Sequence, residues 1–241
     1  MGQNTEGALA AEEAPLRCAE KRKDMNDHIL YNPLAGGGSG RARAEKLAQS
    51  LPGGTAQLTD LTQLHDYGAF FASVPAGNRI FLTGGDGTLN ETITGLLSAG
   101  ADTPIGYIPA GSTNDFASSL KLPTNILKAT QTIVEGEPVS YDVGRFGGRY
   151  FSYVASFGAF TRSSYATPQN VKNALGHTAY VLSGITELSQ IRNEHVKMEI
   201  DGQTVEGDFL FGAICNSTSV GGILTLDPKQ VDMGDGLFEI L

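Results

Sequence analysis

The sequence has few of the features that mark several classes of protein. Its two cysteines, Cys18 and Cys215, stand in unrelated contexts and form no disulfide or metal framework, so a reducing, cytosolic setting is expected. No apolar run approaches the ~18–20 residues that a membrane-spanning helix needs. Charged residues make up only 18%, and 17 basic against 26 acidic residues give a net charge of −9. This balance argues against a general nucleic-acid-binding protein.

The first 26 residues also lack the apolar core of a signal peptide. They begin with Met1 and Gly2, but Glu6 stands where an N-myristoylation motif needs Ser or Thr. Small, polar and charged side chains fill the rest of the segment. We expect residues 1–26 to form a mobile tail or a short surface helix.

From residue 28 onward, short apolar runs alternate with segments of helical periodicity. Strands are predicted at 28–32, 55–59, 79–84 and 104–109, and helices at 41–51, 62–73, 87–97 and 112–120. Such alternation indicates βαβ units, and hence a parallel sheet with helices on both faces. The predicted fold class is α/β, with a first domain over residues 27–138.

The pattern changes after about residue 138, where strand follows strand. Apolar runs at 139–146, 149–160, 195–201 and 207–217 are separated by turn signals, and a helix is predicted at about 171–191. This succession predicts a second, mainly antiparallel β-rich domain over residues 139–241. The last segment, GLFEIL, reads as a strand in which the chain stops, so we expect the domain to be C-terminally incomplete.

The segment LTGGDGTLNE (82–91) leaves a buried strand, turns through glycines and opens a helix. Glycines there allow positive φ angles and bring backbone N–H groups close to a ligand, and a helix N-terminus favours anions. The carboxylate of Asp86 would repel a phosphate unless a cation lay between them. The segment predicts a nucleotide phosphate with Mg²⁺, or a base that deprotonates an acceptor hydroxyl. The alternative is a tight connection in which Asp86 caps the helix.

Two further segments share this layout. PAGSTNDF (109–116) offers Ser112 or Thr113 as a helix N-cap. NPLAGGGSG (32–40) follows the first strand and lacks the Walker pattern G-x-x-x-x-G-K-[ST]. Because the carboxyl ends of parallel strands meet at one edge of a sheet, the three loops together predict a phosphate-binding rim.

With these motifs in place, the sequence resembles the diacylglycerol kinase catalytic-domain family of bacterial lipid kinases, relatives of sphingosine and ceramide kinases. The matching segments, in order, are YNPLAGGGSG, TGGDGTLNE, IPAGSTNDFA, YDVGRF, NSTSVGG and DMGDGLFEI. The resemblance implies a phosphofructokinase-like nucleotide domain followed by a β-rich lipid-binding domain. It also implies ATP- and Mg²⁺-dependent phosphorylation of a lipid hydroxyl at the inner membrane surface, most simply diacylglycerol to phosphatidic acid.

Carried over by position, the resemblance also implies the site residues. The ATP contacts are Asn32, Ser39, Thr59, Gly84, Gly85, Asp86, Gly87, Thr88, Leu89, Asn90 and Ser112. Asp86 is the candidate catalytic residue, either holding Mg²⁺ through water or accepting the hydroxyl proton, and Asn90 at i+4 is expected to face the same site. A structural Mg²⁺ site is implied at the turn DMGDGL, from the Asp235 carboxylate and the carbonyls of Asp232 and Leu237. Without the resemblance, this segment reads as a plain Asp-Gly turn.

Alternatives to an active lipid kinase remain open at this point. Many bacterial members carry an Asp-Gly-Glu motif near the C-terminus, and the sequence has none after Leu241, which leaves an inactive nucleotide- or lipid-binding remnant as one alternative. A NAD kinase shares GGDGT, although YNPLAGGGSG and DMGDGLFEI together favour the lipid kinase. Net charge −9 argues against simple attraction to anionic lipids, so peripheral docking would need a local basic or apolar patch. The sequence predicts no oligomeric state.

Overall fold

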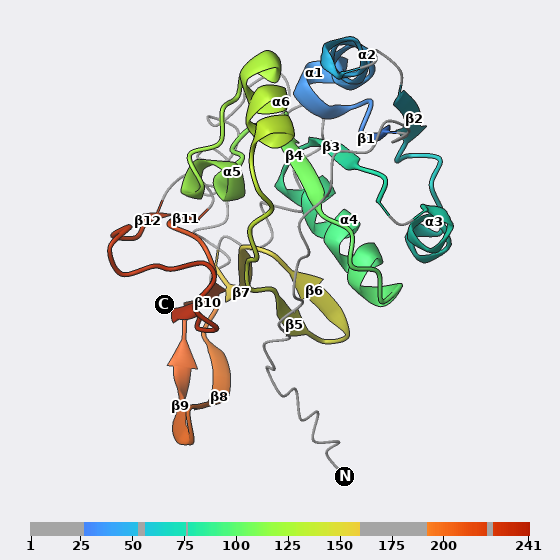
Figure 1. Ribbon diagram of the computed structural model, residues 1–241. Coiled ribbons are helices and arrows are strands. Elements are labelled where there is room, and N and C mark those ends of the chain that lie inside the picture. The colour runs from blue at the N-terminus through green and yellow to red at the C-terminus, as the bar shows by residue number, and fades with distance from the viewer. Residues whose placement is uncertain (1–26, 53–55, 76, 160–191, 221–223) are drawn as a thin grey trace.

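The structure, a computed structural model, describes residues 27–52, 56–75, 77–159, 192–220 and 224–241 (Figure 1). A parallel sheet with helices on both faces forms the first part of the fold, and short antiparallel sheets form the second. This arrangement confirms the predicted α/β fold class with a following β-rich part. The expected tail at 1–26 and the helix expected at 171–191 lie outside the described residues.

Four parallel strands form the central sheet in the order β2-β1-β3-β4. They are β1 (Asp27–Tyr31), β2 (Ala56–Asp60), β3 (Ile80–Gly84) and β4 (Ile105–Pro109), each within a residue of its predicted run. Leu30 of β1 lies opposite Thr59 on one side and Leu82 on the other. The chain passes from β1 to β2 on one side of β1 and then to β3 on its other side. This reversal makes a topological switch point between β1 and β3.

Among the described residues, six helices accompany the sheet: α1 (Ala35–Gly38), α2 (Gly40–Ser50), α3 (Tyr67–Ser73), α4 (Asp86–Ser98), α5 (Asp115–Ser119) and α6 (Ile126–Glu135). Alternate strand residues supply the two cores because strand side chains alternate between faces. Ile29 and Phe81 pack in a cluster with residues of α2 and α6, whereas Leu30 and Leu82 pack with residues of α3 and α4. As a result, the helices that follow β1 and β3 lie on opposite faces of the sheet.

Two helices begin later than the sequence predicts. The prediction of a helix from residue 62 is wrong because Asp66 ends the preceding turn: its side chain accepts a hydrogen bond from the backbone N–H of Ala69 at 2.8 Å and caps α3. The prediction from residue 112 is wrong because the Asn114 carboxamide bonds both backbone groups of Gly111, at 2.7 and 2.9 Å, and closes a turn before α5.

Helix α6 was not predicted. Its Ile126 and Ala129 are buried against the sheet, and the hydroxyl of Thr130 lies 3.3 Å from that of Ser50 on α2. The three-residue spacing of Ile126 and Ala129 is the periodic signal that could have revealed it.

Antiparallel pairs make up the second part. Its strands are β5 (Gly144–Phe146), β6 (Arg149–Phe151), β7 (Val154–Gly158), β8 (Glu194–Ile200), β9 (Gln203–Phe209), β10 (Phe211–Cys215), β11 (Ser219–Val220), β12 (Leu224–Thr225) and β13 (Glu239–Ile240). Strand β10 pairs with β7 and β13, and the other strands that the structure describes here form three two-stranded sheets. Met233 joins the core cluster of Leu82 and Phe116, so the two parts share apolar packing.

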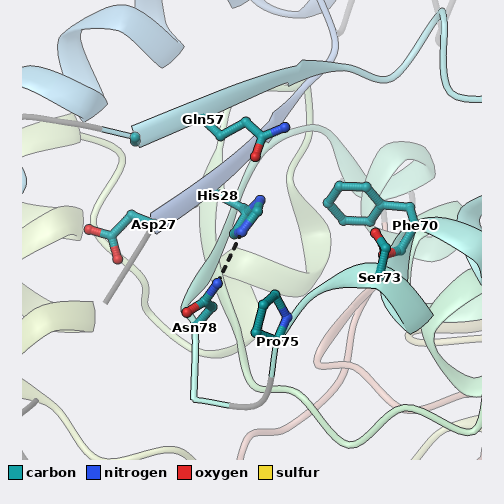
Figure 2. Close-up of a pocket in the computed structure, with 8 residues that line it drawn as sticks. Asp27, His28, Gln57, Phe70, Ser73, Pro75 and Asn78 are labelled. Atoms are coloured by element: carbon teal, nitrogen blue, oxygen red, sulfur yellow. Dashed lines mark hydrogen bonds between the residues drawn. The ribbon is translucent and has the colours of Figure 1, made fainter. Parts of the chain in front are cut away.

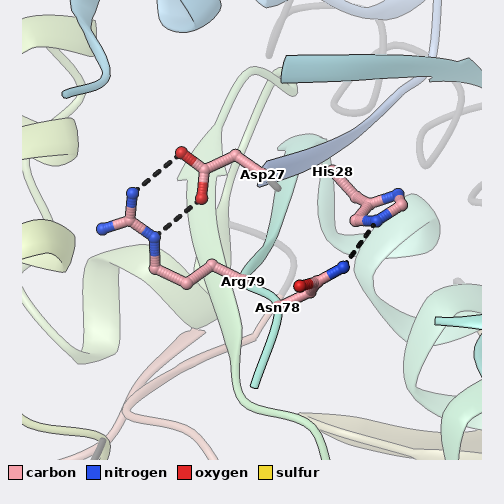
Figure 3. Close-up of polar contacts among 4 residues, drawn as sticks. All are labelled: Asp27, His28, Asn78 and Arg79. Atoms are coloured by element: carbon pink, nitrogen blue, oxygen red, sulfur yellow. Dashed lines mark hydrogen bonds and ion pairs between the residues drawn. The ribbon is translucent and has the colours of Figure 1, made fainter. Parts of the chain in front are cut away.

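A partly buried ion pair lies at the N-terminal edge of the central sheet (Figure 3). The Arg79 guanidinium donates two hydrogen bonds, of 2.7 and 2.8 Å, to the carboxylate of Asp27, which is 2% exposed. Next to this pair, His28 lies 3.3 Å from the Asn78 carboxamide, and burial lowers the pKa of its imidazole. None of the described helices is long and apolar enough to cross a membrane.

Candidate nucleotide-binding site

Three loops leave the carboxyl ends of β1, β3 and β4 and meet at one edge of the sheet. We call residues 32–39 the first loop, 84–87 the second and 110–114 the third. A Cβ atom on Gly85 would lie 3.0 Å from the Cα of Gly111, so the second and third loops touch through their backbones. Asn32 Nδ2 donates to Thr88 Oγ1 at 3.3 Å, and this bond joins the first loop to α4, the helix that follows the second loop. The predicted convergence of the three loops is confirmed.

Glycines serve different purposes in these loops. Gly36, Gly37 and Gly38 have φ angles of 59°, 72° and 88°, which side chains rarely adopt. Positive φ was also expected in the second loop, and that expectation is wrong: Gly85 has φ −93°. Glycine is needed there for close approach, because Cβ atoms on Gly84 and Gly85 would crowd Thr88 and Gly111 respectively.

Asp86 lies at the centre of the convergence. One carboxylate oxygen, Oδ2, accepts hydrogen bonds from the backbone N–H of Asp115 at 3.0 Å and from the Thr113 hydroxyl at 3.2 Å. The other, Oδ1, accepts from the N–H of Phe116 at 3.1 Å. Asp86 therefore caps α5 from a different loop. The alternative that it caps its own helix is wrong, since α4 has Gly85 at its N-cap and no capping side chain.

The N-cap of α5 also differs from the prediction. The N-cap residue is Asn114, in the left-handed region at φ 53°, and it makes no side-chain capping bond. Ser112 is exposed, and Thr113 donates its hydroxyl to Asp86. The sequence predicts that Ser112 or Thr113 caps α5, but in the structure the Asp86 carboxylate does so.

Burial controls the acidity of Asp86, which is 7% exposed. Desolvation raises the pKa of its carboxyl above the ordinary value, and the hydrogen bond from Phe116 acts in the opposite direction. The neighbouring Asp115 raises the pKa further. A carboxylate with a raised pKa holds a proton more readily than an exposed one, as a general base must.

The other predicted contacts have varied surroundings. Thr59 lies near the carboxyl end of β2, opposite Leu30, at the same edge as the loops. The Ser39 hydroxyl donates to the carbonyl of Gly36 at 2.7 Å and closes the first loop. Leu89 is buried in the core, so its side chain is not available to a ligand bound at the loops.

Asn90 contacts the second part of the fold. Its Nδ2 donates to the Tyr150 carbonyl at 3.1 Å, and its Oδ1 accepts from the N–H of Ser152 at 3.0 Å. Asp86 reaches toward the third loop instead. The two side chains were expected to face one site, and in the structure they bond to different elements.

Arg43 is a residue of this edge that the motifs did not reveal. It lies in the first turn of α2, and its Nη2 donates to the Pro109 carbonyl at 3.1 Å, joining the helix after the first loop to the end of β4. Its Nε is buried without a partner, and no carboxylate of the described chain lies within ion-pair distance of it. A cation at a helix N-terminus is electrostatically unfavourable unless an anion compensates it. Its place one turn beyond the glycine-rich loop was the signal available in the sequence.

The proposed structural metal site is a turn whose carboxylates bond to the backbone. Asp232 Oδ1 accepts from the N–H of Gly234 at 3.1 Å, and Asp235 Oδ1 from that of Leu237 at 3.0 Å. Asp142 Oδ2 accepts from the N–H of Gly236 at 2.6 Å. In the described part of the chain no three His, Cys, Asp or Glu side chains surround a metal position, but the predicted set relies mainly on carbonyls, so it stays a prediction.

A hollow at the opposite edge of the sheet contains none of the predicted site residues (Figure 2). It is lined by Asp27, His28, Ala56, Gln57, Phe70, Ser73, Pro75 and Asn78. These residues lie toward the starts of the parallel strands. The candidate site is therefore the rim of loops at the carboxyl ends, where ligands of such sheets bind.

Comparison with known proteins identifies relatives of the chain. A family model described as the diacylglycerol kinase catalytic domain matches residues 27–146. A diacylglycerol kinase of Bacillus subtilis is 33% identical over 218 residues, covering 88% of this chain and 72% of the relative. One of Staphylococcus carnosus is 38% identical over 162 residues, or 67% of this chain, and the match spans 53% of its length.

A solved structure gives the same result. The crystal structure of a diacylglycerol kinase from Bacillus anthracis superposes with a TM-score of 0.69 at 28% identity, covering 91% of this chain and 74% of the other. The chain thus spans about half of the Staphylococcus relative and about three quarters of the Bacillus ones. It belongs to the diacylglycerol kinase family.

Proposed function

We propose that the chain binds ATP with Mg²⁺ in the crevice between the three loops and phosphorylates the free hydroxyl of diacylglycerol, giving phosphatidic acid and ADP. The observation that carries the proposal is the meeting of three amide-lined loops around Asp86 at the switch point of the sheet. The acceptor is inferred from the relatives, which bear the name diacylglycerol kinase. The reaction would take place at the inner face of the cell membrane.

The residues of the crevice fit a polyphosphate. No heavy atom lies within 4 Å of the Cβ position of Gly37, Gly38 or Gly87, which leaves room for a ligand against the backbone. Helices α2 and α4 begin at the first and second loops, and their N-termini favour an anion. Arg43 adds a cation without a carboxylate partner among the described residues, and we include it as a phosphate ligand.

The same residues fit Mg²⁺ in a particular way. Hard cations prefer oxygen ligands, and Asp86 offers a carboxylate at the junction of the second and third loops. Because both of its oxygens already accept hydrogen bonds from the chain, contact through water is the arrangement that keeps these bonds. A cation on the triphosphate would neutralise charge that develops on the phosphate oxygens.

The transfer then requires positioning and one proton acceptor. The loop amides and Arg43 would hold the phosphates in place while the acceptor oxygen forms a bond to the γ-phosphorus and the bond to the β-phosphate oxygen breaks. The hydroxyl proton would pass to Asp86, whose raised pKa suits it to hold that proton. We also retain the second Mg²⁺ site, formed by the Asp235 carboxylate and the carbonyls of Asp232 and Leu237.

The experiment supplies the chain with radiolabelled ATP and Mg²⁺ and offers diacylglycerol and NAD side by side. We expect labelled phosphatidic acid, and loss of product with EDTA or in Asp86→Asn. Labelled NADP as the product would contradict the proposal in favour of a NAD kinase. ATP binding without transfer would identify the inactive alternative.

A further inference from the structure

The hairpin of β5 and β6 carries an exposed aromatic ring between two arginines. Phe146 is 69% exposed, more than any other large apolar side chain that the structure describes. Arg145 and Arg149 on either side are also exposed. In the register of the hairpin Phe146 lies opposite Arg149, so the ring and a guanidinium share one face of its tip.

The tip is unobstructed. Gly147 and Gly148 form the turn with φ angles of 57° and 80°, as a two-residue hairpin turn requires, and nothing lies within 4 Å of their Cβ positions. The Arg145 guanidinium lies 5.9 Å from the centroid of the Tyr150 ring. Among the described residues neither arginine has a carboxylate at ion-pair distance, so the hairpin presents two uncompensated cations on a chain of net charge −9.

The base of the hairpin is fixed to the helix that begins at Asp86. The Tyr150 carbonyl accepts from Asn90 Nδ2 at 3.1 Å and from the Thr94 hydroxyl at 3.4 Å, both on α4. Phe151 is buried and its ring lies 5.6 Å from that of Phe238. Figure 1 shows the hairpin beside α4, at the side of the molecule away from α1 and α2.

We propose that this hairpin docks the protein on an anionic bilayer. Phe146 inserts at the boundary of headgroups and acyl chains, while Arg145 and Arg149 bind lipid phosphates. An apolar ring with adjacent cations matches the chemistry of such a surface, which the overall acidic charge would otherwise repel. The inference rests on the proposed function, because a diacylglycerol acceptor lies in the bilayer. Asn90 would then hold the docked hairpin in a fixed position relative to the helix of the site.

The test measures co-sedimentation of the full chain, without nucleotide, with vesicles of phosphatidylcholine alone or mixed with phosphatidylglycerol. A basic residue near an anionic surface contributes about fivefold in affinity, so Arg145→Gln with Arg149→Gln should lower binding to the mixed vesicles about 25-fold. Phe146→Ser should lower it about tenfold. Lys197→Gln and Val205→Ser, exposed residues of the β8–β9 hairpin, are the controls and should stay within twofold of wild type.

Equal binding by wild type and the hairpin variants, or an equal loss in the β8–β9 controls, would overturn the inference. So would self-association of the wild type that Phe146→Ser abolishes, since the hairpin would then be an interface between copies. Activity on a dissolved short-chain diacylglycerol separates this inference from the proposed function. The hairpin variants should phosphorylate the dissolved substrate as fast as wild type does. If wild type does not phosphorylate the dissolved substrate but still binds vesicles through the hairpin, only the proposed kinase reaction is refuted.

Discussion

Asp86→Ala should destabilise the protein as well as inactivate it. The substitution removes the carboxylate that accepts hydrogen bonds from the buried N–H groups of Asp115 and Phe116, and a buried N–H that loses its acceptor costs about 1–3 kcal/mol. Burial of the charged carboxylate is unfavourable and raises the pKa of Asp86, so removing this carboxylate offsets part of the cost. We expect a net loss of about 2 kcal/mol in the free energy of unfolding at pH 7. Loss of a single exposed helix cap would cost only about 1 kcal/mol.

Urea denaturation measures this loss, with Asp66→Ala as the matched control. Asp66 caps α3 through one bond to Ala69 on an exposed turn, so its removal should cost about 1 kcal/mol and leave ATP binding intact. An Asp86→Ala protein no less stable than Asp66→Ala would refute the assignment of Asp86 as the cap of α5.

The pH dependence of Asp86→Asn tests the raised pKa. Because the folded pKa of Asp86 lies above the unfolded value of about 3.9, its contribution to stability is complete below that value and is lost as the pH rises through the folded pKa. The stability of wild type relative to Asp86→Asn should therefore fall as the pH rises above about 4 and through the folded pKa. A constant difference over this range contradicts the argument.

Three further predictions concern the loops and the sheet. Gly85→Ala brings a Cβ atom to 3.0 Å from Gly111, so it should lower ATP affinity at least tenfold in a titration, whereas Gly207→Ala on β9 should not change it. Arg43→Gln should lower ATP affinity about tenfold, or 1.4 kcal/mol, while Arg41→Gln, exposed and paired with Glu45, stays at the wild-type value. Arg79→Met leaves the Asp27 carboxylate buried and unpaired, so urea denaturation should show a loss of about 3–5 kcal/mol with ATP affinity unchanged.

Local patterns predicted much of the first part of the fold. The apolar runs around Ile29 and Phe81 are buried strands, and strand ends fix where loops begin, so the three loops could be assigned to one edge. Periodicity cannot show that a turn is held by a side chain. Asp66 and Asn114 shortened two helices in this way.

Contacts between distant segments were beyond such patterns. Asp86 and Phe116 are 30 residues apart in the sequence. Only the folded structure shows that Asp86 caps α5, the helix that contains Phe116. Asn90 seemed to belong with Asp86 by its spacing, but it bonds to β6, which lies 60 residues along the chain. Arg43 belongs to no motif, and its relevance depends on the position of the Pro109 carbonyl.

The central claim is that ATP with Mg²⁺ binds where the three loops meet. An NMR titration of the ¹⁵N-labelled chain tests it most directly, since it reports each backbone amide. We predict saturable shifts at Gly37, Gly85 and Gly111, one in each loop, and unchanged signals at His28 and Asn78 on the opposite edge. Saturable shifts confined to His28 and Asn78, with the loop amides unchanged, would contradict the account.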